Sequence, residues 1–408
     1  MPERRVVVVG ASLAGLRAVQ GLRGAGFEGT VTLVGAEEHL PYDRPPLSKQ
    51  FLAGEWDLDR FELAPQATLD GLGVDVRLGA RATDLDLTGR TVTLHGGDRL
   101  GFDHLVVATG ASPRELPGTP ELEGVHTLRT LDDSLAIANA LGGRPRVVVV
   151  GAGFIGAEVA ATARTKGLDV TVLEALPVPL SRGLGPTLGP AVAALHDDHG
   201  ARLRLGVGVA GFEGVGRVER VVLTDGSTVD ADLVVVGIGV VPATGWVEAS
   251  GLEIRDGIVC DDACRAVGTT GVWAAGDVAR WPNELFGEEM RLEHWDNAAA
   301  QGQAVGRAIG AVEAGDDPKP FAPVPFVWSE QYDAMIQILG RPHADDRVEV
   351  ALGSFEERTF VALLERDGLL SGVVGMNDSR RTMRFRRLLG SRPTIDEARA
   401  TAAELREG

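Results

Sequence analysis

The stretch RVVVVGAGFIGAEVAATARTKGLDVTVLE, residues 146–174, decides the fold of this chain. It opens with Arg146–Val150, a β-branched run typical of a buried parallel strand. The motif Gly151-x-Gly153-x-x-Gly156 follows, then a helical segment, Ala157–Lys166, and a second strand, Val170–Leu173. The three glycines allow, in order, the turn, close approach of the backbone to a pyrophosphate, and packing of helix on strand. The pattern predicts a dinucleotide-binding unit; the alternative is a tight turn that binds nothing.

Glu174 closes the second strand and indicates which dinucleotide binds. A carboxylate at this point accepts hydrogen bonds from a ribose 2′-hydroxyl and repels a 2′-phosphate. The pyrophosphate would lie at the helix N-terminus, where backbone N–H groups and the helix dipole favour negative charge. We therefore expect NADH rather than NADPH at this site.

The same pattern occurs earlier, with strand Arg5–Val9, the motif Gly10-x-Ser12-x-x-Gly15, a helix to about Leu22 and strand Thr30–Val34. This repetition predicts an internal duplication of the dinucleotide-binding fold. Serine replaces the second glycine, but it is small enough to leave room for backbone approach. The acidic residue after the second strand is displaced to Glu37, which we predict to bind the ribose; alternatively, Glu37 is a surface charge.

Further strands also end in small-residue turns, as expected where a parallel sheet presents its carboxyl ends to ligands. Leu105–Ala108 precedes Thr109 and Gly110, and Leu233–Val236 precedes the turn 237–239. Val272–Ala275 precedes Gly276 and Asp277. A carboxylate at position 277 can accept hydrogen bonds from a polyol chain, which a flavin has and a nicotinamide dinucleotide lacks. Asp277 therefore favours a flavin at the first site.

Bulk properties exclude several classes of protein. At roughly 100–200 residues per domain, 408 residues predict two to four domains, and a net charge of −18 disfavours nucleic acid as a partner. The two cysteines, Cys260 and Cys264, cannot build a disulfide framework, so we expect a cytoplasmic protein. No run approaches 18 apolar residues, so no membrane span is expected. The eight histidines lack ligand spacing, so no metal is expected.

Taken together, these motifs resemble the FAD- and NADH-dependent ferredoxin reductases of the putidaredoxin reductase and biphenyl dioxygenase reductase type. The most diagnostic string is Pro41-Tyr42-Asp43-Arg44-Pro45-Pro46-Leu47-Ser48-Lys49. The resemblance covers nearly the whole chain. It continues through Ala108-Thr109-Gly110, Leu128-Arg129-Thr130, Gly151–Glu158, Gly237–Gly239, Gly276-Asp277, Trp295-x-Asn297-Ala298 and Trp328-Ser329-x-x-Tyr332.

The resemblance implies an α/β, glutathione-reductase-like fold with two Rossmann-type dinucleotide-binding domains and a C-terminal α+β interface domain. The FAD-binding domain would be discontinuous, comprising 1–113 and 243–318. The NAD-binding domain would comprise 114–242, and the interface domain 319–408. The proline-rich stretch 314–325 would be the linker to the C-terminal domain.

The resemblance also implies site residues, transferred position by position. For FAD they are Gly10, Ser12, Ala14, Gly15, Arg44, Lys49, Ala82, Thr109, Gly110, Arg129, Asp277 and Trp295. For NADH they are Gly151, Gly153, Ile155, Glu158, Glu174, Arg182 and Gly239. Relatives often carry Asp at the position of Ala36, so that contact would shift here to Glu37 or be lost.

Two pairs of residues receive specific roles. Lys49 and Glu158, placed near the flavin N5 by resemblance, are predicted to pair and orient the nicotinamide as catalytic residues; alternatively, they are a surface lysine and a helix glutamate. Arg44 and Arg129 are predicted to clamp the FAD pyrophosphate, because a guanidinium suits phosphate oxygens; alternatively, they are solvated. Trp295 precedes a small-residue helix whose N-terminus would face the flavin, although core packing would also explain this tryptophan.

Cysteine positions and charge suggest where the electrons go. Relatives that reduce disulfides carry a redox cysteine pair after the first unit, and here no cysteine precedes Cys260. We therefore expect an NADH:ferredoxin reductase that serves a haem monooxygenase or ring-hydroxylating dioxygenase. The alternatives are a rubredoxin reductase or NADH oxidase, and a redox-sensing flavoprotein of the apoptosis-inducing-factor type.

A basic segment is the candidate docking site for an acidic ferredoxin. It lies between residues 380 and 392 and contains no acidic residue. The alternative is a solvated helix face. A monomer is the default expectation. The basic residues are Arg380, Arg381, Arg384, Arg386, Arg387 and Arg392.

Overall fold

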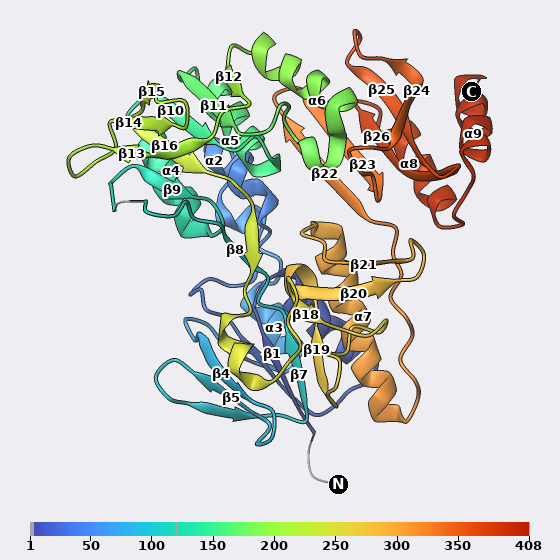
Figure 1. Ribbon diagram of the computed structural model, residues 1–408. Coiled ribbons are helices and arrows are strands. Elements are labelled where there is room, and N and C mark those ends of the chain that lie inside the picture. The colour runs from blue at the N-terminus through green and yellow to red at the C-terminus, as the bar shows by residue number, and fades with distance from the viewer. Residues whose placement is uncertain (1–3, 120, 408) are drawn as a thin grey trace. The chain divides into compact units, whose positions relative to one another are not determined.

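The computed structural model describes residues 4–119 and 121–407, which form two compact units (Figure 1). Unit 1 contains the chain up to Asp43 together with Leu58–Ser112 and Val241–Pro325. Unit 2 contains Arg44–Asp57, Pro113–Val240 and the chain from Phe326 onward. The chain changes unit within strands β8 (Ala111–Pro113) and β17 (Val240–Pro242), and also at either end of segment 44–57 and between Pro325 and Phe326.

The division differs from the predicted boundaries at residues 44–57 and 319–325, and unit 2 contains both the predicted NAD-binding domain and most of the predicted interface domain. Residues 44–57, which we expected within the FAD-binding domain, belong to unit 2. The reason lies in their packing. They form the 3-10 helix η1 (Pro45–Ser48) and the short helix α2 (Gln50–Ala53), which contact helices α4 (Leu131–Gly142) and α5 (Phe154–Thr165).

Unit 1 is built on a five-stranded parallel sheet in the order β19-β7-β1-β2-β3. The register pairs Val9 with Val107 and Val107 with Ala274, so three strands end at one edge. Strands β1, β2, β7 and β19 are almost fully buried, as parallel strands covered on both faces should be, whereas the edge strand β3 is only partly buried. The strands are β1 (Arg5–Val9), β2 (Thr30–Val34), β3 (Val74–Arg77), β7 (His104–Val107) and β19 (Val272–Ala274).

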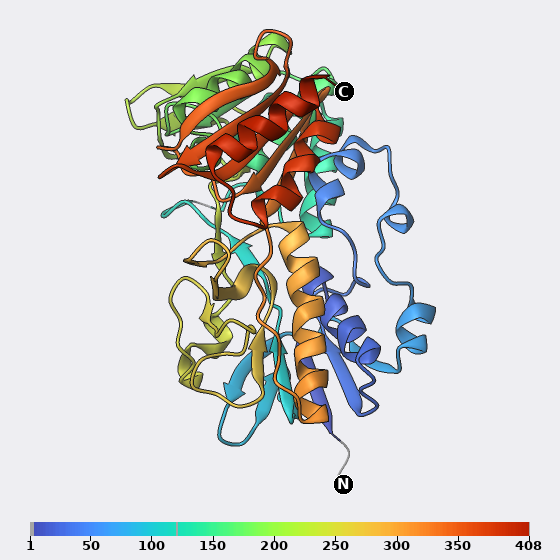
Figure 2. The same ribbon diagram turned by 90° about the vertical axis from the view of Figure 1, so that its right-hand side faces the viewer.

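Helices α1 (Leu13–Gly24) and α7 (Trp295–Ala314) pack closely against one another in unit 1 (Figures 1 and 2). Glycines of α7 make this approach possible. A Cβ on Gly302 would lie 2.2 Å from the carbonyl oxygen of Ala14, and one on Gly306 would lie 2.1 Å from that of Ala18. The small residues of α7 therefore let it lie directly on the helix that follows the first glycine motif.

Smaller elements complete unit 1. Two three-stranded sheets, β4-β5-β6 and β18-β20-β21, accompany the parallel sheet. Their strands are β4 (Ala82–Asp86), β5 (Thr91–Leu94), β6 (Arg99–Gly101), β18 (Ile258–Val259), β20 (Ala279–Asn283) and β21 (Glu288–Met290). The short helices are η2 (Leu58–Arg60), α3 (Gln66–Gly71), η3 (Gly245–Ser250) and η4 (Gly276–Val278).

Unit 2 repeats the architecture of unit 1 with a parallel sheet in the order β12-β11-β10-β16-β9. Val150 pairs with Leu173 and with Val236, so the strand ends again share one edge. An antiparallel sheet, β13-β14-β15, accompanies it. The strands are β9 (Val125–Thr127), β10 (Val147–Val150), β11 (Val170–Glu174), β12 (Arg202–Leu205), β13 (Val209–Glu213), β14 (Arg220–Leu223), β15 (Thr228–Asp230) and β16 (Leu233–Val236).

The C-terminal part of unit 2 is a five-stranded antiparallel sheet in the order β22-β23-β26-β25-β24. Helix α6 (Ser181–Asp198) packs on one face through leucines and Val192, which meet Ile336, Ile338 and Val374. Successive residues of a strand face opposite sides of the sheet, so Gly375, next to Val374, faces the other side. There it lies against Thr382 of α8. The elements are β22 (Phe326–Gln331), β23 (Ala334–Gly340), β24 (Arg347–Ser354), β25 (Thr359–Arg366), β26 (Leu369–Met376), α8 (Ser379–Leu389) and α9 (Ile395–Glu407).

Strand-like runs in the sequence at 347–355, 359–366 and 368–374 predict β24, β25 and β26, whereas β22 and β23 lie outside the predicted runs. The linker expected at 314–325 contains no helix or strand after Ala314. Among the described helices, none combines the length and apolar character needed to cross a bilayer.

Candidate functional site

The first glycine motif lies where β1 ends at the edge of the unit 1 sheet. Gly10 has a φ of +120°, and a Cβ there would lie 2.1 Å from the carbonyl oxygen of Ala108. A Cβ on Gly15 would lie 1.9 Å from the carbonyl oxygen of Gly10. Both positions therefore require glycine, because the backbone leaves no room for a Cβ, and at Gly10 also because L-residues rarely adopt this φ. The turn also brings Gly10 beside Ala108 and Thr109 at the end of β7, and Gly110 follows with a φ of +70°.

The N-terminus of α1 starts directly after this turn. Ser12 is its N-cap residue, and its side chain makes no capping hydrogen bond within the described chain. Ala14 is buried in the first turn. The first backbone N–H groups of the helix are thus available to an anion, which is how a pyrophosphate binds in this fold. The serine that breaks the glycine motif leaves this arrangement intact.

Glu37 lies in the segment after β2, beside the first glycine motif. A Cβ on Gly35 of this segment would lie 2.8 Å from that of Ala11. The Tyr42 hydroxyl donates a hydrogen bond to the Glu37 carboxylate, which is half-buried. Ala36 and Glu38 are exposed. Tyr42, from the diagnostic string, therefore orients the carboxylate that we predicted to bind the ribose.

Asp277 and Trp295 flank the same edge of the unit 1 sheet. Asp277 is 9% exposed and lies in η4, directly after β19. Trp295 begins α7, and its indole Nε1 donates to Asp43 at 2.7 Å. Burial raises the pKa of Asp43, while the Trp295 hydrogen bond and Arg17 act to lower it. Trp295 is half-buried.

Asn297 is a polar residue of this site that the sequence-based assignment left out. It lies in the first turn of α7 and is only 3% exposed. Its side-chain Oδ1 is buried with no hydrogen-bond partner among the described residues. Buried polar atoms are rarely left unpaired, so this atom points to a bound group that carries a donor. The sequence signal was present in the segment Trp295-x-Asn297-Ala298.

The second glycine motif repeats this geometry in unit 2. Gly151 has a φ of +98°, and a Cβ there would lie 2.4 Å from the carbonyl oxygen of Gly237. Gly153 is the N-cap residue of α5, and a Cβ on Gly156 would lie 2.0 Å from the carbonyl oxygen of Gly151. Gly239, in the turn after β16, has a φ of +101°. The two motifs are therefore equivalent in structure, as the duplication predicted.

Glu174 is fixed beside the second motif by two backbone N–H groups. Ala152 donates to its Oε2 at 2.7 Å and Leu176 donates to its Oε1 at 2.9 Å. Ile155 and Leu176 are large apolar side chains that are 44% and 41% exposed here. Exposed apolar groups around a fixed carboxylate suit an adenosine, with its apolar ring and ribose hydroxyls. The side chain of Arg182, also predicted to bind NADH, lies outside the described part of the structure.

Replacing Glu174 by glutamine is expected to raise the dissociation constant for NADH about tenfold, because hydrogen bonds to a charged group contribute about 1.5–3 kcal/mol. NADPH binding should improve at the same time, because the charge that repels a 2′-phosphate is gone. Titration of both nucleotides, followed by flavin fluorescence, measures the two constants. An unchanged NADH/NADPH ratio would remove Glu174 from the ribose site.

Lys49 and Glu158 form the most buried ion pair of the candidate site. The Lys49 Nζ lies 2.9 Å from Oε2 of Glu158, and their side chains are 10% and 4% exposed. The Ser48 hydroxyl donates to the same oxygen at 2.5 Å, and the Ser329 hydroxyl donates to Oε1 at 2.8 Å. The pair predicted from the sequence therefore exists, and the two serines extend it. A buried carboxylate needs such partners, because desolvation otherwise costs several kcal/mol.

Arg44 and Arg129 also come together within unit 2. An Arg44 guanidinium nitrogen donates to the carbonyl oxygen of Arg129. The N–H of Arg129 donates to Asp133, which belongs to a capping box with Thr130 at the start of α4. The two arginines belong to unit 2, whereas Gly10, Asp277 and the start of α7 belong to unit 1. The pyrophosphate clamp stays a prediction.

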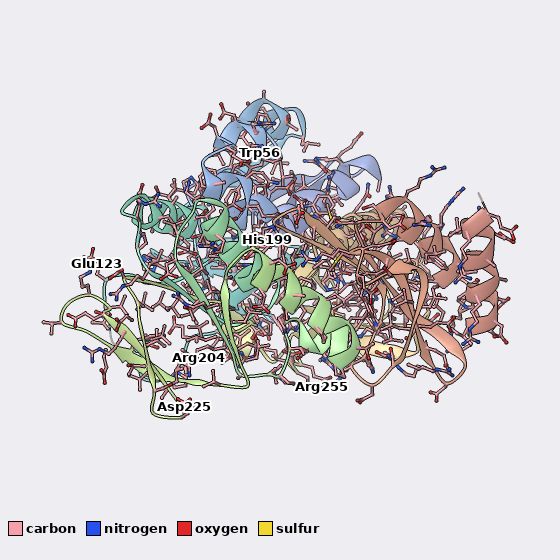
Figure 3. The ribbon with its side chains drawn as sticks, turned by 90° about the horizontal axis from the view of Figure 1, so that it is seen from above. Trp56, Glu123, His199, Arg204, Asp225 and Arg255 are labelled. Atoms are coloured by element: carbon pink, nitrogen blue, oxygen red, sulfur yellow. The ribbon has the colours of Figure 1, made fainter. Side chains whose placement is uncertain are left out.

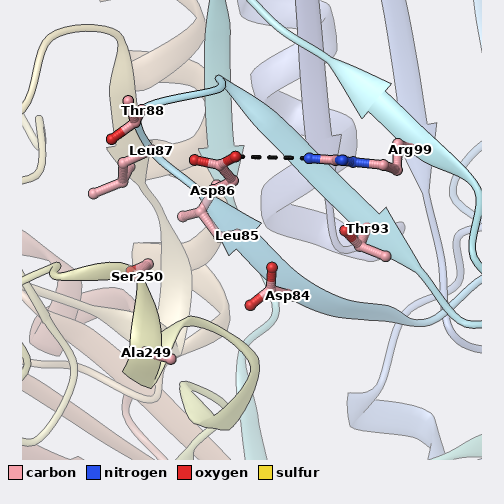
Figure 4. A pocket seen from close by; sticks show the side chains of 9 residues that line it. All are labelled: Asp84, Leu85, Asp86, Leu87, Thr88, Thr93, Arg99, Ala249 and Ser250. Carbon is pink, nitrogen blue, oxygen red and sulfur yellow. Dashed lines mark ion pairs between the residues drawn. The ribbon is translucent and has the colours of Figure 1, made fainter.

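An open polar recess lies on the small sheet of unit 1, and its lining includes no residue of either glycine motif (Figure 4). Asp86 and Arg99 face one another across it at 3.6 Å, and Thr88 and Ser250 add hydroxyl groups. Ala82, the remaining predicted FAD contact, begins β4 of the same sheet and is half-buried. The recess offers a dinucleotide neither a glycine turn nor a helix N-terminus.

Neither cysteine is available for redox chemistry. Cys260 and Cys264 are both buried and not in a disulfide. Burial raises the pKa of Cys264 to about 12 and also raises that of Cys260, so neither forms the reactive thiolate. Within residues 4–119 and 121–407, no cluster of three potential metal ligands occurs.

Comparison with known proteins identifies the class that this fold and site define. Residues 4–302 match the family model described as pyridine nucleotide-disulphide oxidoreductase, and residues 326–407 match the model described as reductase C-terminal. The chain belongs to this family of oxidoreductases. The α/β fold with a C-terminal reductase domain, expected from the sequence, is thereby confirmed.

Individual relatives narrow the class. The chain is 36% identical to rhodocoxin reductase of Rhodococcus erythropolis, over 95% of this chain and 89% of the relative. It is 36% identical to the biphenyl dioxygenase system ferredoxin–NAD(+) reductase component of Paraburkholderia xenovorans (strain LB400), over 96% and 94%. The putidaredoxin reductase–putidaredoxin complex superposes with a TM-score of 0.89 and 31% identity, covering 95% of this chain and 93% of that chain. The chain is a member of the ferredoxin reductases, and its cofactors are FAD and NAD(H).

Proposed function

We propose that this protein oxidises NADH, reduces its FAD and passes electrons singly to a ferredoxin that serves an oxygenase. The observation that carries the proposal is the presence of two equivalent glycine motifs, each at the carboxyl edge of its own parallel sheet. Two dinucleotides can thus bind one chain. The buried cysteines offer no internal acceptor, and the relatives include a ferredoxin–NAD(+) reductase component of a dioxygenase system and a reductase in complex with putidaredoxin. FAD supplies the step from hydride to single electrons when bound.

We assign the first motif to FAD and the second to NADH. Asp277, the α7 N-terminus and Asn297 would hold the flavin, since the α7 dipole and the unpaired Asn297 oxygen suit its polar edge. Glu174 would hold the NADH ribose. Lys49 and Glu158 would orient the nicotinamide, because hydride transfer depends on near-attack geometry more than on an acid or base.

Anaerobic stopped-flow spectroscopy tests the proposal. NADH should bleach the flavin rapidly, and cytochrome c should then be reduced quickly only when a ferredoxin is added. Oxygen consumption at the same rate without ferredoxin would instead indicate an NADH oxidase. Slow flavin reduction that leaves a long-lived charge-transfer complex would indicate a redox sensor. We place the protein in the cytoplasm and expect it to be a monomer.

We propose further that the ferredoxin docks on the exposed basic face of α8. Arg380, Arg384 and Arg387 are exposed and lie on one side of the helix at i, i+4 and i+7. Arg381 is instead paired with Asp378 at 2.5 Å, and the Arg386 guanidinium lies 5.4 Å from the centre of the Phe326 ring. Three arginines of the basic segment therefore face solvent together. They are suited to steering an acidic partner.

Reversing two charges on this face should weaken ferredoxin docking. The double variant Arg384→Glu/Arg387→Glu is expected to raise the KM for ferredoxin about tenfold at low salt, with NADH reduction of the flavin unchanged. The difference should shrink as salt screens the charges. Arg217→Glu/Arg347→Glu, which changes net charge equally at two other exposed arginines of unit 2, is the control. Equal KM values for the two double variants would exclude α8 as the docking surface.

A further inference from the structure

Strand β22 carries buried polar side chains on a face of the sheet that is otherwise apolar. Ser329 and Gln331 alternate with Glu330 along the strand, so both point to the same side, and both are fully buried. His196 of α6, which packs on this side, is also fully buried. Buried polar groups cost stability unless they are hydrogen-bonded. The hydrogen-bond partners of Ser329, Gln331 and His196 therefore indicate the role of these side chains.

These side chains connect to the Glu158 carboxylate. The Ser329 hydroxyl lies 2.8 Å from Glu158 Oε1, and the Gln331 Nε2 lies 3.1 Å from the Ser329 hydroxyl. The Gln331 side chain also interacts with the His196 ring. His196 Nδ1 lies 3.0 Å from the Tyr332 hydroxyl. Tyr332 occupies the turn after β22 with a φ of +57°.

The charge on Glu158 determines the direction of every bond in this series. An ionised carboxylate only accepts, so the Ser329 hydroxyl must donate to it and must accept from the Gln331 NH₂ group. The Gln331 Oε1 is then left to accept from His196. Gln331 Oε1 and His196 Nε2 are both buried, and neither has a hydrogen-bond partner among the described residues. A direct contact or one bridging water molecule would satisfy both atoms at once.

The protonation state of His196 agrees with this direction. Burial lowers the pKa of His196 to about 4, with a smaller opposing contribution from Gln331 and a minor lowering by His199. The ring is therefore neutral above pH 5 and carries one N–H, which must be on Nε2 if it donates to Gln331. Nδ1 then accepts from Tyr332, whose own pKa burial raises to about 12. A neutral tyrosine can donate.

We propose that this one-directional chain of hydrogen bonds fixes the Glu158 carboxylate for its pairing with Lys49. Its members, in order toward the carboxylate, are Tyr332, His196, Gln331 and Ser329. Hydrogen bonds that all point the same way polarise and strengthen one another. The four are positioning residues for the nicotinamide, and this role rests on the proposed function of Glu158. The C-terminal sheet thereby contributes to the hydride-transfer site.

The surroundings of the chain provide a matched control. His199 stacks on the Tyr332 ring, with 3.9 Å between ring centroids and 11° between the planes. It follows the end of α6 (Figure 3) and lies 3.6 Å from Asp333. Arg164 is the further charged group that acts on Tyr332. His199 thus touches the same tyrosine as His196 without belonging to the series.

Nuclear magnetic resonance of ¹⁵N-histidine-labelled holoenzyme, in the oxidised state, tests the chain without turnover. We expect His196 to be the neutral Nε2–H tautomer from pH 8 to pH 5 and to protonate only as the pH falls toward about 4. Glu158→Gln, which removes the charge that sets the direction, should shift the His196 nitrogen resonances. A His196→Gln variant assigns the signals. An Nδ1–H tautomer, or resonances unchanged in Glu158→Gln, would overturn the proposal.

Kinetics test the role in nicotinamide positioning. Ser329→Ala and Gln331→Leu are expected to slow flavin reduction by NADH about tenfold at unchanged FAD content, while Ser329→Thr restores the rate. His199→Gln should react as the unaltered protein does. A confirmed tautomer with unchanged kinetics would overturn the positioning role and leave the assignment of Lys49 and Glu158 to be decided by Lys49→Ala. If Lys49 variants reduce the flavin more slowly but the His196 tautomer test fails, only the proposed series of hydrogen bonds is overturned.

Discussion

Lys49→Ala is expected to slow reduction of the flavin by NADH at least a hundredfold, because a displacement of about 1 Å from reactive geometry can cost that factor. The variant removes the only ammonium within 4 Å of Glu158 among the described residues, and the Glu158 side chain is only 4% exposed in the intact pair. Both groups that orient the nicotinamide would thus be altered by one change. Stopped-flow measurement of flavin bleaching at saturating NADH gives the rate directly.

Lys166→Ala is the matched control for this prediction. Lys166 also bonds segment 44–57, through the carbonyl oxygen of Ala53 at 2.9 Å, but its ammonium is solvent-exposed and far along α5 from the pair. The control should keep the original rate. Bound FAD should be equal in both variants. If NADH reduced Lys49→Ala as quickly as the unaltered protein, the orienting role would be wrong.

The sequence predicted the parts of the fold that depend on local chemistry. Glycines at 10 and 151 have backbone conformations and contacts that no other residue tolerates, so the motif determined the turn. Valine runs determined the buried strands on either side. Lys49 and Glu158, more than one hundred positions apart, were paired only through the family resemblance, because nothing in their local sequence links them.

The features that the sequence did not predict depend on long-range packing. Strand β22 mixes aromatic, charged and amide residues. Ser329 and Gln331 on one side of the strand are buried, whereas the residues on the other side are only partly buried. Such a mixture lacks the alternation that marks a strand. Segment 44–57 was likewise assigned by chain order, whereas its contacts with α4 and α5 place it in unit 2. No sequence pattern marked His196 as a site residue, because it lies in α6 whereas Gln331 and Tyr332 lie in or next to β22.

Two glycine substitutions should separate the cofactor sites. In Gly10→Ala the new methyl group would lie 2.1 Å from the Ala108 carbonyl oxygen, and in Gly151→Ala it would lie 2.4 Å from that of Gly237. Both positions also have a φ near +100° or above, which disfavours alanine. Each motif should therefore open and lose its pyrophosphate site, with no direct effect on the other.

The two variants are expected to fail differently. Gly10→Ala should purify with less than about a tenth of the normal FAD, whereas Gly151→Ala should retain FAD but bind NADH at least a hundredfold more weakly, since a lost phosphate site removes several charge-assisted hydrogen bonds. Flavin absorbance and NADH titration measure the two losses. Gly24→Ala and Gly142→Ala, where a new Cβ meets nothing within 4 Å, are the controls in units 1 and 2. Loss of FAD in Gly151→Ala with retention in Gly10→Ala would reverse the assignment of the two sites.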